Sequence, residues 1–131
     1  EFVSGQTVAI LQAALAASDA LLARGQKLPL CSSVEAPEAD RIATLAVTRT
    51  GAWQVITPRL KAVLNGSGDL IAALFLGQRL LGRPVPNALA RAVAATFAVL
   101  ELSQGQPEMQ LVAAQEQLAA PTARLVAERV R

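Results

Sequence analysis

Apolar residues recur with a helical period over the first part of the chain. The members of this stripe are Val8, Leu11, Leu15 and Leu22. A spacing of three to four residues is typical of a helix with one buried face. The pattern predicts a helix over about residues 7–24, with Thr7 as its N-cap and Gly25 as the residue that ends it.

The pattern changes to short apolar and β-branched runs after this helix. Residues 27–34 predict a short buried strand, which Pro29 restricts to a sheet edge or an irregular start. Residues 42–48 and 52–57 are two further strand-like runs, and the short link that joins them contains Gly51. A glycine-containing link between β-branched runs predicts a hairpin.

The second half of the chain predicts helices. Residues 69–81 carry apolar side chains on nearly every side, so we expect neighbours to bury this helix all round. Residues 86–102 place one apolar stripe on a further helix. A last helix is expected over residues 107–119, with Leu111 and Leu118 facing inward, and the tail through Arg131 is expected to be loosely held.

This order of a helix, then strands, then helices predicts an α/β fold. Three short strands are too few to cover the apolar faces of four helices. A truncated larger domain therefore explains the pattern better than a complete small module does.

Composition narrows the classes of function. Aromatic residues make up 3% of the 131 residues, the net charge is +2 and no run of Lys or Arg occurs, so we expect neither a nucleic-acid partner nor a membrane partner. Histidine is absent, which excludes histidine bases and most zinc sites. Cys31 is the only cysteine, a usage typical of the reducing cytoplasm. The apolar runs fall short of the ~18 residues that a membrane span needs.

The segment Asn65-Gly66-Ser67-Gly68-Asp69 lies at the predicted start of a helix. Glycines allow backbone N–H groups to gather there, and the helix dipole adds partial positive charge, so the turn could hold phosphate oxygens. Asp69 could accept a proton from a hydroxyl at the same place. Ordinary capping by Ser67 or Asp69 also fits these residues, and both explanations stay open. A Walker A loop and a dinucleotide-binding glycine motif are absent.

The wider segment over residues 65–76 resembles the Gly-Thr/Ser-Gly-Asp signature and following helix of ribokinase-superfamily kinases, most closely the bacterial pyridoxal kinases. Supporting matches are Glu1-Phe2-Val3-Ser4-Gly5, Leu45-Ala46-Val47-Thr48 with Trp53, and Leu111-Val112-Ala113-Ala114-Gln115. The resemblance implies the C-terminal portion of a ribokinase-like three-layer αβα sandwich. Residues 1–131 would then be the C-terminal half of a single kinase domain whose N-terminal half is absent.

The same resemblance implies roles for the turn. Asp69 would be the catalytic base, and Gly66, Ser67 and Gly68 would form the anion hole around the transferred phosphate. No residue of this chain is implied as a metal ligand, although Mg²⁺ is expected to accompany ATP and a monovalent cation is left open.

Two further segments resemble nucleotide contacts of the family. The first consists of Thr57, Pro58, Arg59 and Leu60, for which a plain strand exit is the alternative. The second is Ser32, at a position where relatives place Lys or Thr near the phosphates, and a polar strand end is its alternative.

The function implied for the intact enzyme is ATP-dependent phosphorylation of the 5′-hydroxyl of pyridoxal by a cytoplasmic homodimer. The 131-residue chain alone is expected to be inactive. Two alternatives stay open: a non-catalytic fragment that acts through association, and another ribokinase-superfamily kinase such as a hydroxymethylpyrimidine kinase.

Overall fold

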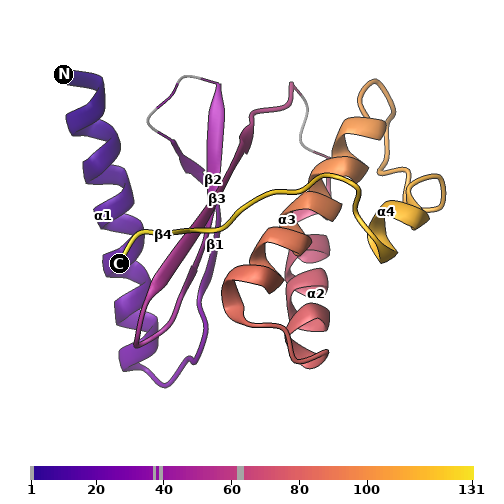
Figure 1. Cartoon of the computed structure of the whole chain (residues 1–131). Helices are drawn as coiled ribbons and strands as arrows, with labels where there is room; N and C mark the ends of the chain where they lie inside the picture. Colours follow the sequence, from indigo (N-terminus) through magenta and orange to yellow (C-terminus); the bar gives the residue numbers. More distant parts are fainter. Residues whose placement is uncertain (1, 37, 39, 62–63) are drawn as a thin grey trace. The chain divides into compact units, whose positions relative to one another are not determined.

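A computed structural model describes residues 2–36, 38, 40–61 and 64–131. The chain forms two compact units (Figure 1). Unit 1 comprises Glu1–Arg59 and Glu128–Arg131, and unit 2 comprises Leu60–Ala127. The match that involves Glu1 lies outside the described residues.

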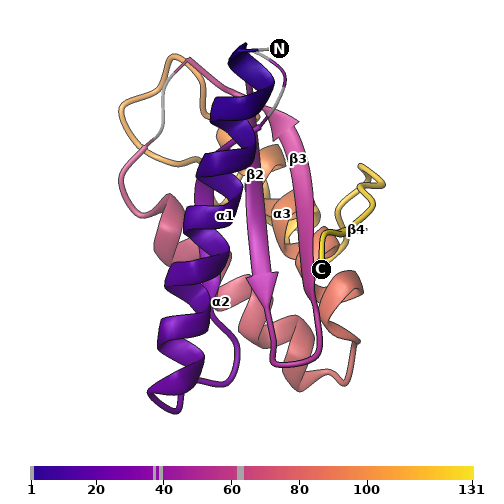
Figure 2. The same ribbon diagram turned by 90° about the vertical axis from the view of Figure 1, so that its left-hand side faces the viewer.

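Unit 1 is a four-stranded antiparallel sheet with one helix. Its elements are α1 (Phe2–Ala23), β1 (Leu30–Glu35), β2 (Arg41–Val47), β3 (Ala52–Pro58) and β4 (Glu128–Arg129). The strands lie in the order β1-β2-β3-β4, and every neighbouring pair is antiparallel. α1 packs along the sheet against β1 and β2 (Figure 2).

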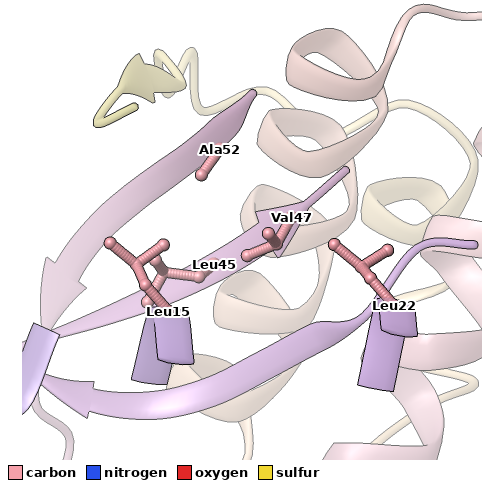
Figure 3. Packing of buried hydrophobic residues seen from close by; sticks show 5 residues of the cluster. All are labelled: Leu15, Leu22, Leu45, Val47 and Ala52. Atoms are coloured by element: carbon pink, nitrogen blue, oxygen red, sulfur yellow. The ribbon is translucent and has the colours of Figure 1, made fainter. Parts of the chain in front are cut away.

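The core of unit 1 lies between α1 and the sheet. Leu15 and Leu22 project from α1 toward Leu45 and Val47 of β2 and Ala52 of β3 (Figure 3). All five side chains are buried. The helical spacing of the leucines therefore identified the buried face of α1 correctly, because this face closes the core.

The ends of α1 differ in how well the sequence predicted them. The helix begins at Phe2, so the prediction of Thr7 as its N-cap was wrong. Gly25 ends the helix as predicted, at φ +99°. Its N–H donates to the Leu22 carbonyl and that of Gln26 to the Leu21 carbonyl, which is the Schellman pattern that favours glycine at this position.

β1 is an edge strand, as Pro29 predicted, but none of its residues is fully buried, so the prediction of a buried strand was wrong. It starts at Leu30, one residue after the proline, and the Pro29 carbonyl accepts the N–H of Val47. Its register with β2 shifts between Cys31 and Val34, and Ser33 within the shift has φ +58°. Such a bulge bends an edge strand and disfavours pairing with another chain.

The predicted hairpin is confirmed. β2 pairs with β3 from Arg41↔Pro58 to Val47↔Ala52. Thr48 organises the link: its Oγ1 accepts the N–H groups of Thr50 and Gly51 at 3.2 and 3.1 Å, and its own N–H donates to the Gly51 carbonyl.

The C-terminal tail is not loosely held, and that prediction was wrong. Glu128–Arg129 pairs with Gln54 and Trp53 as β4. The Arg129 guanidinium carbon lies 5.4 Å from the centre of the Trp53 ring, and Nη2 donates to the Thr50 carbonyl at 2.9 Å. Arg131 forms a 2.8 Å ion pair with Asp19, and this hydrogen bond raises the pKa of Arg131.

Unit 2 is helical, with α2 (Ser67–Leu80), α3 (Val85–Leu102) and α4 (Gln115–Ala119). α3 packs against both of the other helices. α2 is not buried all round as predicted, because three leucines near its C-terminal end are 59–79% exposed. These are Leu76, Leu80 and Leu81.

The predicted helix over residues 107–119 is wrong in its first half. Only Gln115–Ala119 is α-helical, and Leu111 is exposed rather than inward. The physical reason is a hydrogen bond from the N–H of Gln110 to the buried Ser103 Oγ, at 2.8 Å. This bond ties the segment to the end of α3 in a series of turns.

α3 has 18 residues and a mean hydropathy of 1.3, so its length and composition would allow it to cross a membrane. Its uninterrupted apolar run is nevertheless shorter than the helix, because Asn87, Arg91 and Glu101 lie within it. Half of its residues are buried within the protein. Small side chains at Ala88, Ala92 and Ala95 are buried along it, as is common where a core helix packs closely.

Candidate functional site

A type II turn leads into α2. The N–H of Ser67 donates to the Leu64 carbonyl at 3.3 Å and closes the turn, with Asn65 and Gly66 at its centre. Gly66 has φ +91° and ψ −2°, the values of the third residue of such a turn, where glycine is strongly favoured. The turn conformation therefore explains why the first residue of the Gly-Ser-Gly-Asp segment is glycine.

Three backbone N–H groups around this turn have no acceptor among the described residues: those of Gly66, Gly68 and Asp69. The first hydrogen bond of the helix runs from the N–H of Leu70 to the Gly66 carbonyl at 2.9 Å. Unpaired N–H groups at a helix N-terminus lie where partial positive charge accumulates. The turn thus has donors available for an anion, whereas the N–H of Ser67 is already used.

The capping alternative is wrong. The N-cap is Gly66, and no side chain donates to or accepts from the helix end. Asp69 lies in the first turn of α2 as an exposed carboxylate with no ion pair among the described residues. Its negative charge in the first turn is favourable to the helix dipole, and the carboxylate remains open to solvent. The catalytic role itself stays a prediction.

The other predicted nucleotide residues lie mainly in unit 1. Thr57 is buried at the end of β3, where it pairs with Ile42, and Pro58 pairs with Arg41. Arg59 is exposed, and its N–H donates to the Asp40 carbonyl at 2.6 Å. Leu60, half-buried, is the first residue of unit 2.

Ser32 is exposed on β1, next to the bulge and two strands away from Thr57 in the sheet. Cys31, the neighbour of Ser32, lies level with Gln54 through Leu45, whereas Thr57 lies level with Glu35 through Ile42, so Ser32 and Thr57 are not at the same end of the sheet. The turn before α2 belongs to unit 2, whereas Thr57 and Ser32 belong to unit 1.

No group of three or more acidic, histidine or cysteine residues that could hold a metal ion occurs among the described residues. The described residues therefore do not form a metal-binding cluster for an ion that accompanies a nucleotide.

Met109 lies next to the turn, and the sequence analysis did not predict this contact. Its Cε methyl lies 3.1 Å from the point where a Cβ atom on Gly66 would stand. The Ser103–Gln110 hydrogen bond holds the segment that carries it. The contact joins residues 43 positions apart, and no local motif surrounds Met109 that could have predicted it.

Comparison with curated proteins gives close sequence relatives. A pyridoxal kinase PdxY from Rubrobacter xylanophilus is 47% identical over 135 residues, and one from Deinococcus radiodurans is 43% identical over 141 residues. Each alignment covers 99% of this chain and 47% of the relative. The chain therefore spans about half the length of the curated relatives it matches. No family model matches the chain.

Solved structures share the fold at lower identity. The pyridoxal kinase of Entamoeba histolytica matches with a TM-score of 0.78 at 20% identity, over 89% of this chain and 43% of that protein. The Leishmania donovani pyridoxal kinase in complex with ADP and pyridoxine also gives 0.78, at 15% identity, over 88% and 43%. A putative phosphomethylpyrimidine kinase from Bacteroides thetaiotaomicron, crystallised with pyridoxal, gives 0.75 at 22% identity, over 86% and 42%.

These structural matches show the fold: the chain has a ribokinase-like α/β fold and spans part of it. The sequence relatives are more specific. The chain is homologous to bacterial pyridoxal kinases over nearly its whole length.

Proposed function

We propose that this chain carries the phosphoryl-transfer residues of an ATP-dependent pyridoxal kinase, which phosphorylates the 5′-hydroxyl of pyridoxal. The observation that carries the proposal is the turn before α2. It combines unpaired N–H groups at Gly66, Gly68 and Asp69 with an exposed carboxylate that does not cap the helix. The homology to pyridoxal kinases supports the choice of substrate.

In the proposed reaction, the 5′-oxygen of pyridoxal attacks the γ-phosphorus of ATP. A new O–P bond forms, the bond between the γ-phosphorus and the β,γ-bridging oxygen breaks, and ADP leaves. The hydroxyl proton passes to the Asp69 carboxylate. The free N–H groups of the turn stabilise the negative charge on the phosphoryl oxygens, which is the main protein contribution to phosphoryl transfer.

Thr57, Pro58, Arg59, Leu60 and Ser32 are proposed to line the nucleotide. A divalent metal that arrives with ATP would neutralise phosphate charge; we take it to be Mg²⁺ and assign it no protein ligand here. A monovalent cation, a homodimer and a cytoplasmic location also belong to the proposal. The half-buried Cys31 thiol, the only cysteine, supports a reducing compartment.

Asp69→Asn in the full-length kinase tests the catalytic assignment. A positioned base contributes ~10²–10⁴-fold to rate, so we expect kcat to fall by ~10² or more. The free energy of unfolding should change by less than ~1 kcal/mol, the usual size of a charge–dipole interaction at a helix end. Glu116→Gln is the matched control, since Glu116 is an exposed acid in the first turn of α4. A kcat for Asp69→Asn equal to that of the control would end the assignment.

Two alternatives rest on particular observations. The likeness to a putative phosphomethylpyrimidine kinase keeps a hydroxymethylpyrimidine substrate as a second candidate, and kcat/KM for the two substrates separates them.

The exposed leucines of α2 favour association of the chain with another protein molecule. Size-exclusion chromatography of the wild type and of the double variant Leu76→Ser/Leu80→Ser measures this association. The non-catalytic alternative would be favoured if the 131-residue chain associates and the full-length protein shows no kinase activity.

A further inference from the structure

A cavity of about 560 Å³ lies in unit 2, between the first half of α3 and the segment over residues 120–127. Its lining contains two charged side chains, Arg91 and Arg124, and no acidic residue. The cavity wall therefore carries two positive charges that nothing in the lining neutralises. Two guanidinium groups around one space are the arrangement that phosphate and carboxylate groups fit best.

The guanidinium of Arg91 makes no hydrogen bond or ion pair among the described residues. Its Nε atom is closed off from solvent, so an anion in the cavity would be bound by the outer N–H groups of the same guanidinium. Charged donors without a partner favour an anionic acceptor. Arg124, which is exposed, has no ion pair among the described residues and remains available to the same acceptor.

The start of α3 adds positive charge at the cavity. Asn87, the third residue of α3, lines the cavity, and its N–H has no acceptor among the described residues. The N-terminus of an 18-residue helix contributes partial positive charge there. The two arginines and the helix N-terminus thus favour the same kind of ligand.

This cavity is separate from the turn before α2. Residues 64–69 are not part of its lining. α3 starts immediately after the C-terminal end of α2, since only residues 81–84 join the two helices (Figure 1). The first half of α3 therefore belongs to the opposite end of the helix pair from Gly66.

We propose that the cavity between α3 and residues 120–127 is a second anion site, which binds a phosphate group through Arg91, Arg124 and the N–H of Asn87. The site goes beyond the kinase reaction, because it needs neither Asp69 nor the glycine turn. A phosphate monoester and free inorganic phosphate present the same oxygens to it, so the two sources must be compared directly.

Titration of the ¹⁵N-labelled 131-residue chain with inorganic phosphate tests the site, with chloride at equal ionic strength as the reference. We expect saturable amide shifts at Asn87, Arg124 and Ala127. Methyl phosphate tests the monoester source: tighter binding than inorganic phosphate would assign the site to phosphorylated small molecules, and weaker binding to the free ion. Either result supports the phosphate site.

The variants give the decisive comparison. Arg124→Gln should weaken phosphate binding about tenfold or more, the usual loss for one charge-assisted hydrogen bond. Arg91→Gln should do the same, and Arg91→Lys, which keeps the charge without the planar fork, should give a smaller loss. Arg49→Gln is the control, because Arg49 is an exposed arginine of unit 1 with the same charge.

Three outcomes would overturn the proposal. One is a phosphate response that does not saturate above the chloride reference. Another is an equal weakening by Arg49→Gln and Arg124→Gln, which would indicate only general charge attraction. The last is a set of shifts confined to residues 66–69, which would place phosphate at the turn before α2 and leave the proposed kinase function intact.

Discussion

The Cε methyl of Met109 lies 3.1 Å from the place that a Cβ atom on Gly66 would occupy. The turn before α2 is therefore confined both by its backbone conformation and by a side chain packed over it. The two constraints have different strengths, because a methionine tip can move whereas φ +91° disfavours any residue with a Cβ.

Gly66→Ala should accordingly lower the free energy of unfolding by about 1–2 kcal/mol, the usual cost of a left-handed conformation for a residue other than glycine. Gly68→Ala is the matched control. A Cβ on Gly68 meets no atom within 4 Å, and the residue lies in α2, so we expect a gain of up to about 1 kcal/mol. Urea denaturation measures both. Changes of the same sign and size would contradict the strained-turn interpretation.

Ser67→Ala should leave the stability nearly unchanged, within about 0.5 kcal/mol, as expected of a substitution that removes no particular contact. The reason is that the Ser67 hydroxyl makes no capping hydrogen bond. A capping serine would instead cost ~1 kcal/mol when replaced by alanine. Thermal unfolding of this variant beside the wild type decides between the two, and a loss of the larger size would restore the capping explanation.

Leu45→Ala should destabilise unit 1 by about 2–5 kcal/mol, because its side chain is fully buried at the centre of the cluster in Figure 3. Leu80→Ala, at a side chain that is 79% exposed, should cost less than about 0.5 kcal/mol. Denaturant midpoints of the two variants give the comparison. Similar losses would mean that the exposed leucines of α2 are covered in solution.

The purified 131-residue chain should not phosphorylate pyridoxal, because the chain spans about half the length of its curated relatives. A coupled assay of ATP consumption measures this. Turnover at the ~1–100 s⁻¹ that is typical of kinases would show that this part of the protein suffices for the reaction.

Local signals explain most of what the sequence predicted correctly. The hairpin of β2 and β3 follows from β-branched runs around Gly51, and the end of α1 follows from Gly25. The turn before α2 could be found because its residues are contiguous. Each of these features depends on interactions within a few positions, which is the range that periodicity and turn chemistry report.

The features that the sequence missed depend on distant partners. β4 consists of Glu128 and Arg129, two charged residues without strand-like alternation, and their pairing with Trp53 and Gln54 defines the strand. The interruption of the expected helix over residues 107–119 depends on Ser103. Arg91 reads as an ordinary polar position of a helix until the cavity beside it is seen.

The short strand β4 covers the outer side of β3. The chain leaves unit 1 after Arg59, at the end of β3, and returns at Glu128 beside Gln54 of that strand. Release of β4 would turn β3 into an edge strand and free the backbone groups that now pair with Glu128 and Arg129. Such an edge is a template for pairing with another chain, so the last residues of the chain protect the sheet of unit 1 against aggregation.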